Sequence, residues 1–515
     1  MDADSRLTSN GCRSRPISGQ EDKNRMDIFE TYRSAAKALD FDALYTIACD
    51  LLAAHELVLP HPTRPKVTTH ARASARARLG NVVYFADASG GNRWALVQAM
   101  NFIDGYVTED GPVVLFDDKC ANIVQHVAEN IRSGKDEAYW TRNDRFGGIS
   151  VGQTRPYHYF YDQAIHLAPL RARLLAEQSI RSIATALGTY LDPAQISAWD
   201  SRAPEPGCYY LMPNVIGGTW WRSRDSASFF EAAARMENMI RANIPEADIH
   251  YPDGSLVVWF GVTAQKRSWL EQIQGYAEIA NSLARHHPSV VVLLDGLTAT
   301  DGRHDNYRDD LMVVEAITRR LDAHILPVTL VGRDYAAKIA HCKKAAAFIA
   351  NAGSGSIVPL RFCAKPGVLH SNTAIQSFRD DSYDFPVHFV EPEFVREVPH
   401  PENPRGDWIS YQIPWQYVHN LFADILRELG FANPEHRQVP DLAKLPISDF
   451  ELFGQLSGQV KPNHSSAHIL RLVGGMFAKT GDPATAAALY EKALLLDPTD
   501  AGVQQFIRQR RLLEK

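Results

Sequence analysis

The sequence predicts an α/β fold in which two doubly wound units follow one another along the chain. The first observation is an alternation of apolar, strand-like runs with segments of helical period over residues 146–250. The second is the same alternation, with longer apolar runs, over residues 251–435. The third is a glycine-serine turn between an apolar run and a helix-like segment within Ala345–Asn372 (AAAFIANAGSGSIVPLRFCAKPGVLHSN). Such strand, turn, helix, strand units bind ligands at the carboxyl ends of their strands.

The composition is that of a globular protein and argues against several classes of function. The chain of 515 residues is 45% hydrophobic and 22% charged, and its length allows roughly three units of about 150 residues each. A formal net charge of -6 gives no overall basic field, which argues against a nucleic-acid-binding protein. The six cysteines form no C-x-x-C pair, so neither a disulfide scaffold nor a zinc site is expected, and reduced thiols in a cytoplasm are the simpler interpretation.

The first 145 residues lack the strand–helix alternation of the two α/β units. Residues 1–25 carry mixed charge without the apolar core of a signal peptide, and we expect a disordered tail. No later run reaches the roughly 20 apolar residues of a membrane span. Residues 26–145 predict a helical and β-meander extension, with helices over Met26–Leu59 and antiparallel strands over Val82–Asp118. The basic stretch between them, residues 61–80, is expected to be a solvated linker.

The first α/β unit, residues 146–250, opens with a strand and a helix that carry candidate catalytic groups. Its sequence FGGISVGQTRPYHYFYD predicts a strand that ends near Val151, a turn, and a helix that starts at Pro156. On that helix His158 and Asp162 are four residues apart and share one face. A carboxylate that fixes the tautomer of a histidine makes it a competent general base, and Arg155 adds a cation beside it. The alternative is a capped helix whose His and Tyr side chains only pack.

The rest of this unit continues the alternation. Three further elements are expected, namely a helical segment over Arg181–Asp200, a strand over Cys208–Pro213 and an amphipathic helix over Ser226–Asn243.

In the second α/β unit, residues 251–435, cationic loops follow the predicted strands. Lys266 and Arg267 follow the strand Leu256–Val262, and Arg303 follows the strand Val290–Leu297. Because the carboxyl ends of parallel strands meet at one edge of the sheet, these cations are expected beside the glycine-serine turn. There Gly353 and Gly355 allow close backbone approach, and Ser354 and Ser356 offer hydroxyls to an anion at a helix start. The spacing matches neither G-x-G-x-x-G nor a P-loop, and the alternative is an ordinary glycine-rich turn.

Residues 436–515 predict a linker followed by a helical repeat. Two helices are expected within Ala467–Asp500, and the spacing of Gly481, Tyr490, Ala493, Leu494 and Pro498 resembles a tetratricopeptide repeat. A single repeat cannot bury its own apolar face, so it would pack against the main body or a protein partner.

Together, two successive Rossmann-like halves, the YHYFYD helix start and the late glycine-serine turn resemble GT-B glycosyltransferases of bacterial surface or capsular polysaccharide biosynthesis. The resemblance covers roughly residues 146–429 and implies two domains that face each other across a cleft. It implies that His158, oriented by Asp162, deprotonates an acceptor hydroxyl, with Arg155 near phosphate or acceptor. It further implies that the cations and the glycine-serine turn bind the diphosphate of a nucleotide sugar. The residues implied are Lys266, Arg267, Arg303, Gly353, Ser354, Gly355 and Ser356.

Departures from the family pattern refine this expectation. Over residues 146–429, which the resemblance covers, the sequence has no Asp-x-Asp metal motif and no E-x7-E spacing, which favours metal-independent, inverting transfer to a glycan or glycolipid, without a separate cofactor. A cytoplasmic enzyme is implied, with docking at the inner membrane surface as a further option. Two alternatives remain open, a nucleotide-sugar-processing enzyme such as an epimerase, and a non-catalytic scaffold that recruits partners through the repeat.

Overall fold

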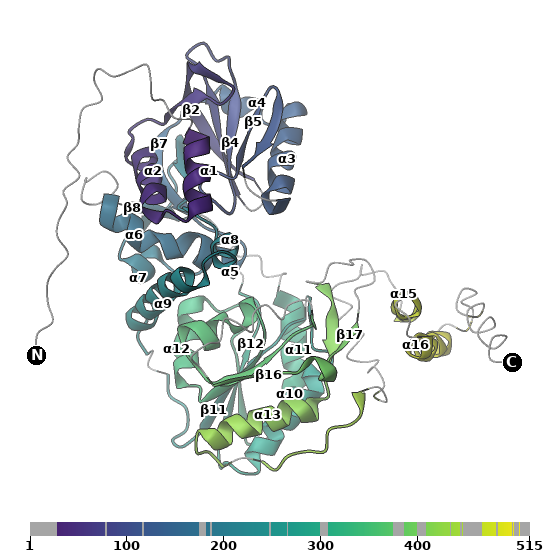
Figure 1. The fold of residues 1–515 in the computed structure, drawn as a ribbon. Helices are drawn as coiled ribbons and strands as arrows, with labels where there is room; N and C mark the ends of the chain where they lie inside the picture. Colours follow the sequence, from purple (N-terminus) through teal and green to yellow (C-terminus); the bar gives the residue numbers. More distant parts are fainter. Residues whose placement is uncertain are drawn as a thin grey trace, which may run out of the picture. The chain divides into compact units, whose positions relative to one another are not determined.

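The computed structural model consists of two units that we describe separately (Figure 1). Unit 1 comprises residues 1–146 and 207–209, and unit 2 comprises residues 147–206 and 210–515. The structure describes residues 28–504 apart from 78–79, 116–117, 175–181, 186–187, 247–248, 265, 299–306, 374–385, 399–407, 433, 443–444, 446–465, 480–482, 497 and 499–503. The predicted tail, residues 1–25, lies outside this range.

Unit 1 contains a six-stranded antiparallel sheet in which the strands lie in chain order. Its strands are β1 (Val58–His61), β2 (Arg64–Ala77), β3 (Gly80–Ala86), β4 (Trp94–Gln98), β5 (Gly105–Thr108) and β6 (Gly111–Val114). Its helices are α1 (Ile28–Ala38), α2 (Phe41–Ala53), α3 (Asp118–Arg132) and α4 (Glu137–Trp140). Every residue of β3 and β4 is buried, because Phe29 of α1 packs on Trp94 while Val124 of α3 shares a core with Tyr84.

The predicted helices and meander of this region are present, but the expectation of a linker over residues 61–80 is wrong. Most of that stretch is β2, the longest strand of the sheet, which pairs with β1 and β3. Its small residues alternate with basic ones, so that Ala71 and Ala73 are buried while arginines reach outward, as Arg64 does toward Asn92. Frequent arginines favour a solvated segment, but their alternation with alanine suits a strand as well.

The first part of unit 2, the N-terminal lobe, contains a small sheet with the strand order β10-β7-β8-β9, in which the β7–β8 and β8–β9 pairs are parallel. Its strands are β7 (Arg145–Val151), β8 (Ser182–Thr185), β9 (Asp200–Arg202) and β10 (Cys208–Leu211); the division between the units falls within β7 and β10. Its helices are α5 (Pro156–His158), the π-helix η1 (Tyr159–Ala164), α6 (Ile165–Leu174), α7 (Pro193–Ser197), α8 (Gly218–Arg222) and α9 (Ser226–Asn243).

One prediction in this lobe is wrong. Residues Arg181–Asp200 do not form one helix, since their described part contains the strand β8, the five-residue α7 and the first residue of β9. The strand β8 has the sequence SIAT, and four residues cover barely one helical turn. Periodicity therefore cannot tell whether so short an apolar run is a helix or a buried strand. The strand over Cys208–Pro213 and the helix over Ser226–Asn243 are confirmed.

The second part of unit 2, the C-terminal lobe, is a parallel sheet of six strands in the order β13-β12-β11-β14-β15-β16. Numbered within the lobe this is 3-2-1-4-5-6, the order of a Rossmann-type sheet. The strands are β11 (Leu256–Gly261), β12 (Val290–Asp295), β13 (Ile325–Thr329), β14 (Ala347–Asn351), β15 (Gly367–His370) and β16 (Val387–Phe389). The strand order reverses between β11 and β14, which opens a crevice at their carboxyl ends.

Helices cover this sheet. They are α10 (Gln272–Ala284), α11 (Arg308–Thr318), α12 (Tyr335–Lys344) and α13 (Trp415–Glu428), with the short helices η3 (Ser354–Ser356), η4 (Ile357–Phe362) and η6 (Pro392–Phe394). Alternate strand residues such as Val258 and Val292 share a core with Ile279 of α10, Val313 of α11 and Phe422 of α13. A two-stranded antiparallel ribbon, β17 (Arg396–Val398) and β18 (Ser410–Gln412), completes the lobe.

The predicted C-terminal helices are present as α15 (Ser466–Lys479) and α16 (Pro483–Leu496). Leu470, Leu489 and Ala493 of this hairpin form a buried cluster with Leu270 and Val398 of the C-terminal lobe, so the hairpin's apolar face is partly covered by the body of unit 2. In the part of the chain that the structure describes, no helix is both long and apolar enough to cross a bilayer.

Candidate active site

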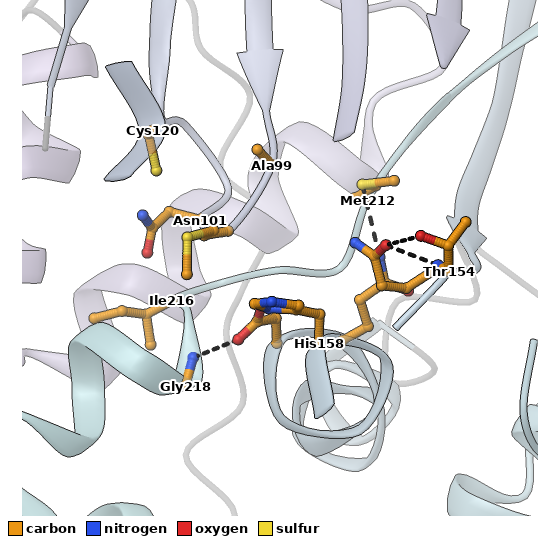
Figure 2. Close-up of polar contacts among 12 residues, drawn as sticks. Ala99, Asn101, Cys120, Thr154, His158, Met212, Ile216 and Gly218 are labelled. Atoms are coloured by element: carbon orange, nitrogen blue, oxygen red, sulfur yellow. Dashed lines mark hydrogen bonds and ion pairs between the residues drawn. The ribbon is translucent and has the colours of Figure 1, made fainter. Parts of the chain in front are cut away.

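The first component of the site is the pair of His158 and Asp162. Nδ1 of His158 lies 2.7 Å from Oδ2 of Asp162. The main-chain N–H of Gly218 donates a 2.7 Å hydrogen bond to Oδ1 of Asp162, drawn as the dashed line from Gly218 in Figure 2. The Asp162 side chain is buried, whereas 21% of the His158 side chain is exposed. Because a carboxylate can only accept, this contact places a proton on Nδ1, and the neutral ring in that tautomer has its lone pair on Nε2. The predicted interaction between these residues is therefore present.

Local sequence explains how this pair is built. Pro156 occupies the first turn of α5, where a missing N–H costs nothing, and the helix continues into a π-helical turn that contains Asp162. A side chain at position 218 would place its Cβ 2.6 Å from the carbonyl oxygen of Tyr161, so only glycine lets the main-chain N–H approach the carboxylate. Neither the π-turn nor the role of Gly218 was predicted.

The second component is a polar cavity of about 130 Å³ at the carboxyl ends of the C-terminal sheet. It lies at the reversal of strand order, because residues that follow β11, β12 and β14 all line it. Four of the predicted ligand-binding residues line this cavity, namely Lys266, Arg267, Ser354 and Gly355. Pro156 of the N-terminal lobe also lines it. Predicted Arg303 and its neighbour His304 lie outside the described residues.

Arg267 is held in an unusual conformation by buried polar groups. Its φ of 52° is in the left-handed region, and its carbonyl oxygen accepts a 3.0 Å hydrogen bond from Nδ2 of Asn351. Asn351 also donates to the hydroxyl of Tyr411 at 2.6 Å, and that hydroxyl lies 2.8 Å from Nδ1 of His370. Burial lowers the pKa of His370 to about 3, so its ring is neutral and accepts from Tyr411. A left-handed non-glycine residue held by such a network is typical of a functional site.

The glycine-serine turn brings the guanidinium of Arg267 close to the backbone. A Cβ at Gly353 would lie 3.4 Å from both terminal nitrogens of Arg267, an ordinary contact distance, while the φ of 114° at this position favours glycine. Ser354 is exposed, whereas Ser356 lines a different cavity and its hydroxyl donates to the carbonyl oxygen of Gly353 at 3.0 Å. The structure therefore separates Gly353 and Ser356 from the four residues in the polar cavity.

Acidic and basic groups that sequence analysis missed form the floor of the polar cavity. Nζ of Lys338 lies 2.6 Å from Oδ1 of Asp295 and donates to the carbonyl oxygen of Gly296 at 2.6 Å. Both side chains of the pair are almost fully buried, and burial raises the pKa of Asp295 while Lys338 opposes that shift. Only the position of Asp295 at the end of a strand could have drawn attention to it, because its partner lies on α12, far along the chain.

Asp310, also missed, connects two loops around the cavity. Its Oδ1 accepts from the N–H of Ala264 at 2.9 Å and its Oδ2 from the N–H of Leu297 at 2.7 Å. Burial raises its pKa to about 6, although the two hydrogen bonds oppose that shift. The loops after β11 and β12, one of which carries Lys266 and Arg267, are thus held by one carboxylate.

The remaining predicted residues are placed apart from this cavity. Arg155 is exposed at the start of α5 and caps it without a side-chain hydrogen bond. His158 lies two residues beyond Pro156 but does not itself line the polar cavity. Within the described ranges, no group of three or more His, Cys, Asp or Glu side chains could hold a metal ion.

No protein-family model and no curated protein matches the chain. Among solved structures it is similar to a glycosyl transferase of family 9 from Veillonella parvula, with 11% identity over 52% of this chain and 67% of that one and a TM-score of 0.24. It is also similar to a mutant of S. aureus TarM in complex with Fondaparinux, alpha-GlcNAc-glycerol and UDP, with 11% identity, 87% and 86% coverage and a TM-score of 0.20. A second TarM structure gives 10% identity, 86% and 84% coverage and a TM-score of 0.20. The first of these is a glycosyl transferase, and the second holds UDP.

Proposed function

We propose that this protein is a GT-B-type glycosyltransferase that moves a sugar from a nucleotide-sugar donor to a glycan or glycolipid acceptor. The observation that carries the proposal is the convergence of Lys266, Arg267, Ser354 and Gly355 on one cavity at the strand-order reversal of a Rossmann-type sheet. Nucleotides are bound at this place in open α/β sheets. The cavity combines fixed cations, a serine hydroxyl and a glycine backbone, which together suit a diphosphate.

In the proposed reaction the protein's own cations replace a metal. Lys266 and Arg267 bind the diphosphate of the donor and stabilise the charge that develops on it as the bond to the anomeric carbon breaks. Lys338 does not serve this role directly, because Asp295 already neutralises it. The arrangement supports transfer without a metal and without a cofactor other than the donor.

The pair of His158 and Asp162 supplies the base. Nε2 of His158 takes the proton of the acceptor hydroxyl while the acceptor oxygen attacks the anomeric carbon from the side opposite to the diphosphate, which inverts its configuration. The orientation of the pair supports this role, because Nδ1 is occupied by Asp162 and Nε2 retains its lone pair. The short α5 brings Pro156, two residues before His158, to the wall of the polar cavity.

The acceptor belongs, on this proposal, to the assembly of a bacterial surface polysaccharide in the cytoplasm or at the inner membrane surface. The hairpin of α15 and α16 is proposed to act as a tetratricopeptide-like module for a protein partner. Leu495, which is 81% exposed on α16, supports a role in contacts beyond the chain.

Calorimetric titration with UDP, GDP, CMP and ADP tests the proposal first. Binding of at least one nucleotide is expected, whereas heat from none of them would contradict it and favour a scaffold. The His158→Ala variant should then bind that nucleotide normally and lose most turnover. Arg235→Ala, which removes a cation on the exposed face of α9, is the control. Product that contains an epimerised sugar and needs no acceptor would favour an epimerase instead.

A further inference from the structure

A second cavity lies on the other side of the glycine-serine turn and is almost entirely apolar. Its volume is about 30 Å³. Four aromatic rings of the N-terminal lobe form one wall, those of Tyr157, Tyr161, Phe229 and Phe230. The opposite wall is formed by the C-terminal lobe, with Gly353, Ser356, Ile357, Leu360, Arg361 and Leu369. We name this cavity the aromatic subsite.

Three polar groups around the aromatic subsite, on Tyr161, Arg361 and Ser356, are engaged by other protein groups. The hydroxyl of Tyr161 donates to Oε1 of Glu237 at 2.8 Å, and Nε of Arg361 donates to the same oxygen at 2.8 Å. The hydroxyl of Ser356 donates to the carbonyl oxygen of Gly353. A hydroxyl placed in this cavity would therefore lose its hydrogen bonds to water with little to replace them, whereas an apolar group would gain from leaving water.

The aromatic subsite adjoins the polar cavity through a single turn. Gly353 lines the aromatic subsite, and the next two residues, Ser354 and Gly355, line the polar cavity. Arg267, which lines the polar cavity, approaches Gly353 from that side. A diphosphate bound at Ser354 and Gly355 would therefore place the group attached to it beside the aromatic subsite.

The size of the aromatic subsite selects what it can hold. About 30 Å³ accepts a group of one or two heavy atoms and is too small for a sugar ring. We propose, on the basis of the function proposed above, that the aromatic subsite binds a methyl group carried by the transferred sugar. An acetamido sugar presents such a methyl through its acetyl group, and a 6-deoxy sugar presents one through its C6.

Donor pairs that differ only at this group test the inference. The first pair is UDP-N-acetylglucosamine and UDP-glucose, and the second is GDP-6-deoxy-D-mannose and GDP-D-mannose. Calorimetry needs no acceptor, and we expect the methyl-bearing member of one pair to bind roughly 10-fold or more tightly than its partner, in line with discrimination by apolar pockets. The pair that shows the preference identifies the source of the methyl group.

The Phe230→Trp variant, which fills the aromatic subsite from a half-buried position, should abolish this preference and leave binding of the free nucleoside diphosphate unchanged. Phe431→Ala, which removes a ring that is 37% exposed after α13, is the matched control.

Three outcomes would overturn the inference while the proposed function stands. They are equal binding within both pairs, tighter binding of the hydroxyl-bearing members, and a preference that survives in Phe230→Trp. Failure of UDP and GDP to bind while CMP or ADP binds would likewise overturn the inference alone, and failure of all four nucleotides would overturn both the inference and the proposed function. If the variant does not fold, the donor pairs still test the inference with the unaltered protein, because equal binding within both pairs overturns it.

Discussion

Asp162 holds His158 with one carboxylate oxygen and the main chain of Gly218 with the other, at 2.7 Å in each case. The carboxylate thereby connects the helix that follows β7 to the first residue of α8. Since both oxygens are engaged, the orientation of the His158 ring is set by a group that is itself fixed from two sides. This relationship makes the tautomer of His158 open to experiment.

Asp162→Asn should keep the hydrogen bond from Gly218 and change the tautomer of His158. The amide nitrogen of asparagine donates, so it would face Nδ1 as an acceptor and move the ring proton to Nε2, where a base needs a lone pair. We expect turnover to fall by about 10²- to 10⁴-fold, the usual contribution of general base catalysis. Steady-state kinetics measures the loss, and titration with the nucleotide should show unchanged affinity. Turnover equal to that of the unaltered protein would exclude His158 as the base.

Lys266→Met should weaken binding of nucleoside diphosphates. Methionine keeps much of the aliphatic stem beside Trp408, over whose ring the ammonium lies at 5.7 Å, and removes only the charge. Loss of a charge-assisted hydrogen bond to phosphate is expected to weaken binding roughly 10- to 100-fold. Calorimetry at two salt concentrations checks this, because the unaltered protein should lose more affinity at high salt than the variant. Arg235→Ala should show neither effect.

Tyr411→Phe should reduce both stability and diphosphate affinity. Without the hydroxyl, buried Nδ1 of His370 and one N–H of Asn351 lose their partner, which costs about 1–3 kcal/mol. Because Asn351 also holds the carbonyl of Arg267, the cation should become less well positioned. Urea unfolding and calorimetry measure the two effects. Tyr139→Phe, in a ring stacked on Tyr84, is the control, and a variant that loses stability but keeps full affinity would show that the network does not position Arg267.

The stability of the protein should fall in mild acid partly through His166. Burial lowers the pKa of His166 to about 4, and its Nε2 donates to the carbonyl oxygen of Ile216 at 2.7 Å. In the unfolded chain the histidine has a pKa near 6.5, so below that pH it binds a proton that the folded protein excludes. The contribution of neutral His166 to the free energy of unfolding is therefore complete above about pH 6.5 and is lost as the pH falls toward 4. Between pH 7 and pH 5 the loss amounts to about 2 kcal/mol.

A His166→Gln variant isolates this contribution, because glutamine can donate to Ile216 but does not titrate. Urea unfolding at pH 7 and pH 5 should show the unaltered protein losing about 2 kcal/mol more than the variant. Other buried histidines, such as His370 and His419, add acid sensitivity of the same sign to both proteins and cancel in the difference. Parallel losses in the two proteins would contradict the assignment.

Local patterns predicted the parts of the site that lie close together in sequence. The four-residue spacing predicted the contact of His158 with Asp162, and the loops after buried strands predicted the meeting of Lys266, Arg267, Ser354 and Gly355. The contributions of Asp295, Asp310 and Lys338 were missed, because each depends on a partner that only the folded sheet brings near. The strand β2 was missed for a different reason, since arginine on the outer face of a strand and arginine in a linker look alike in one sequence.

The two bonds of Asp310 have a mechanical consequence for the loops that they join. The main-chain N–H groups of Ala264 and Leu297 donate to the same carboxylate, so a shift of either loop must move the other loop as well or break a buried hydrogen bond. The two loops at the rim of the polar cavity should therefore move together as one rigid element. Adaptation to a bulkier ligand would have to begin elsewhere along the edge of the sheet.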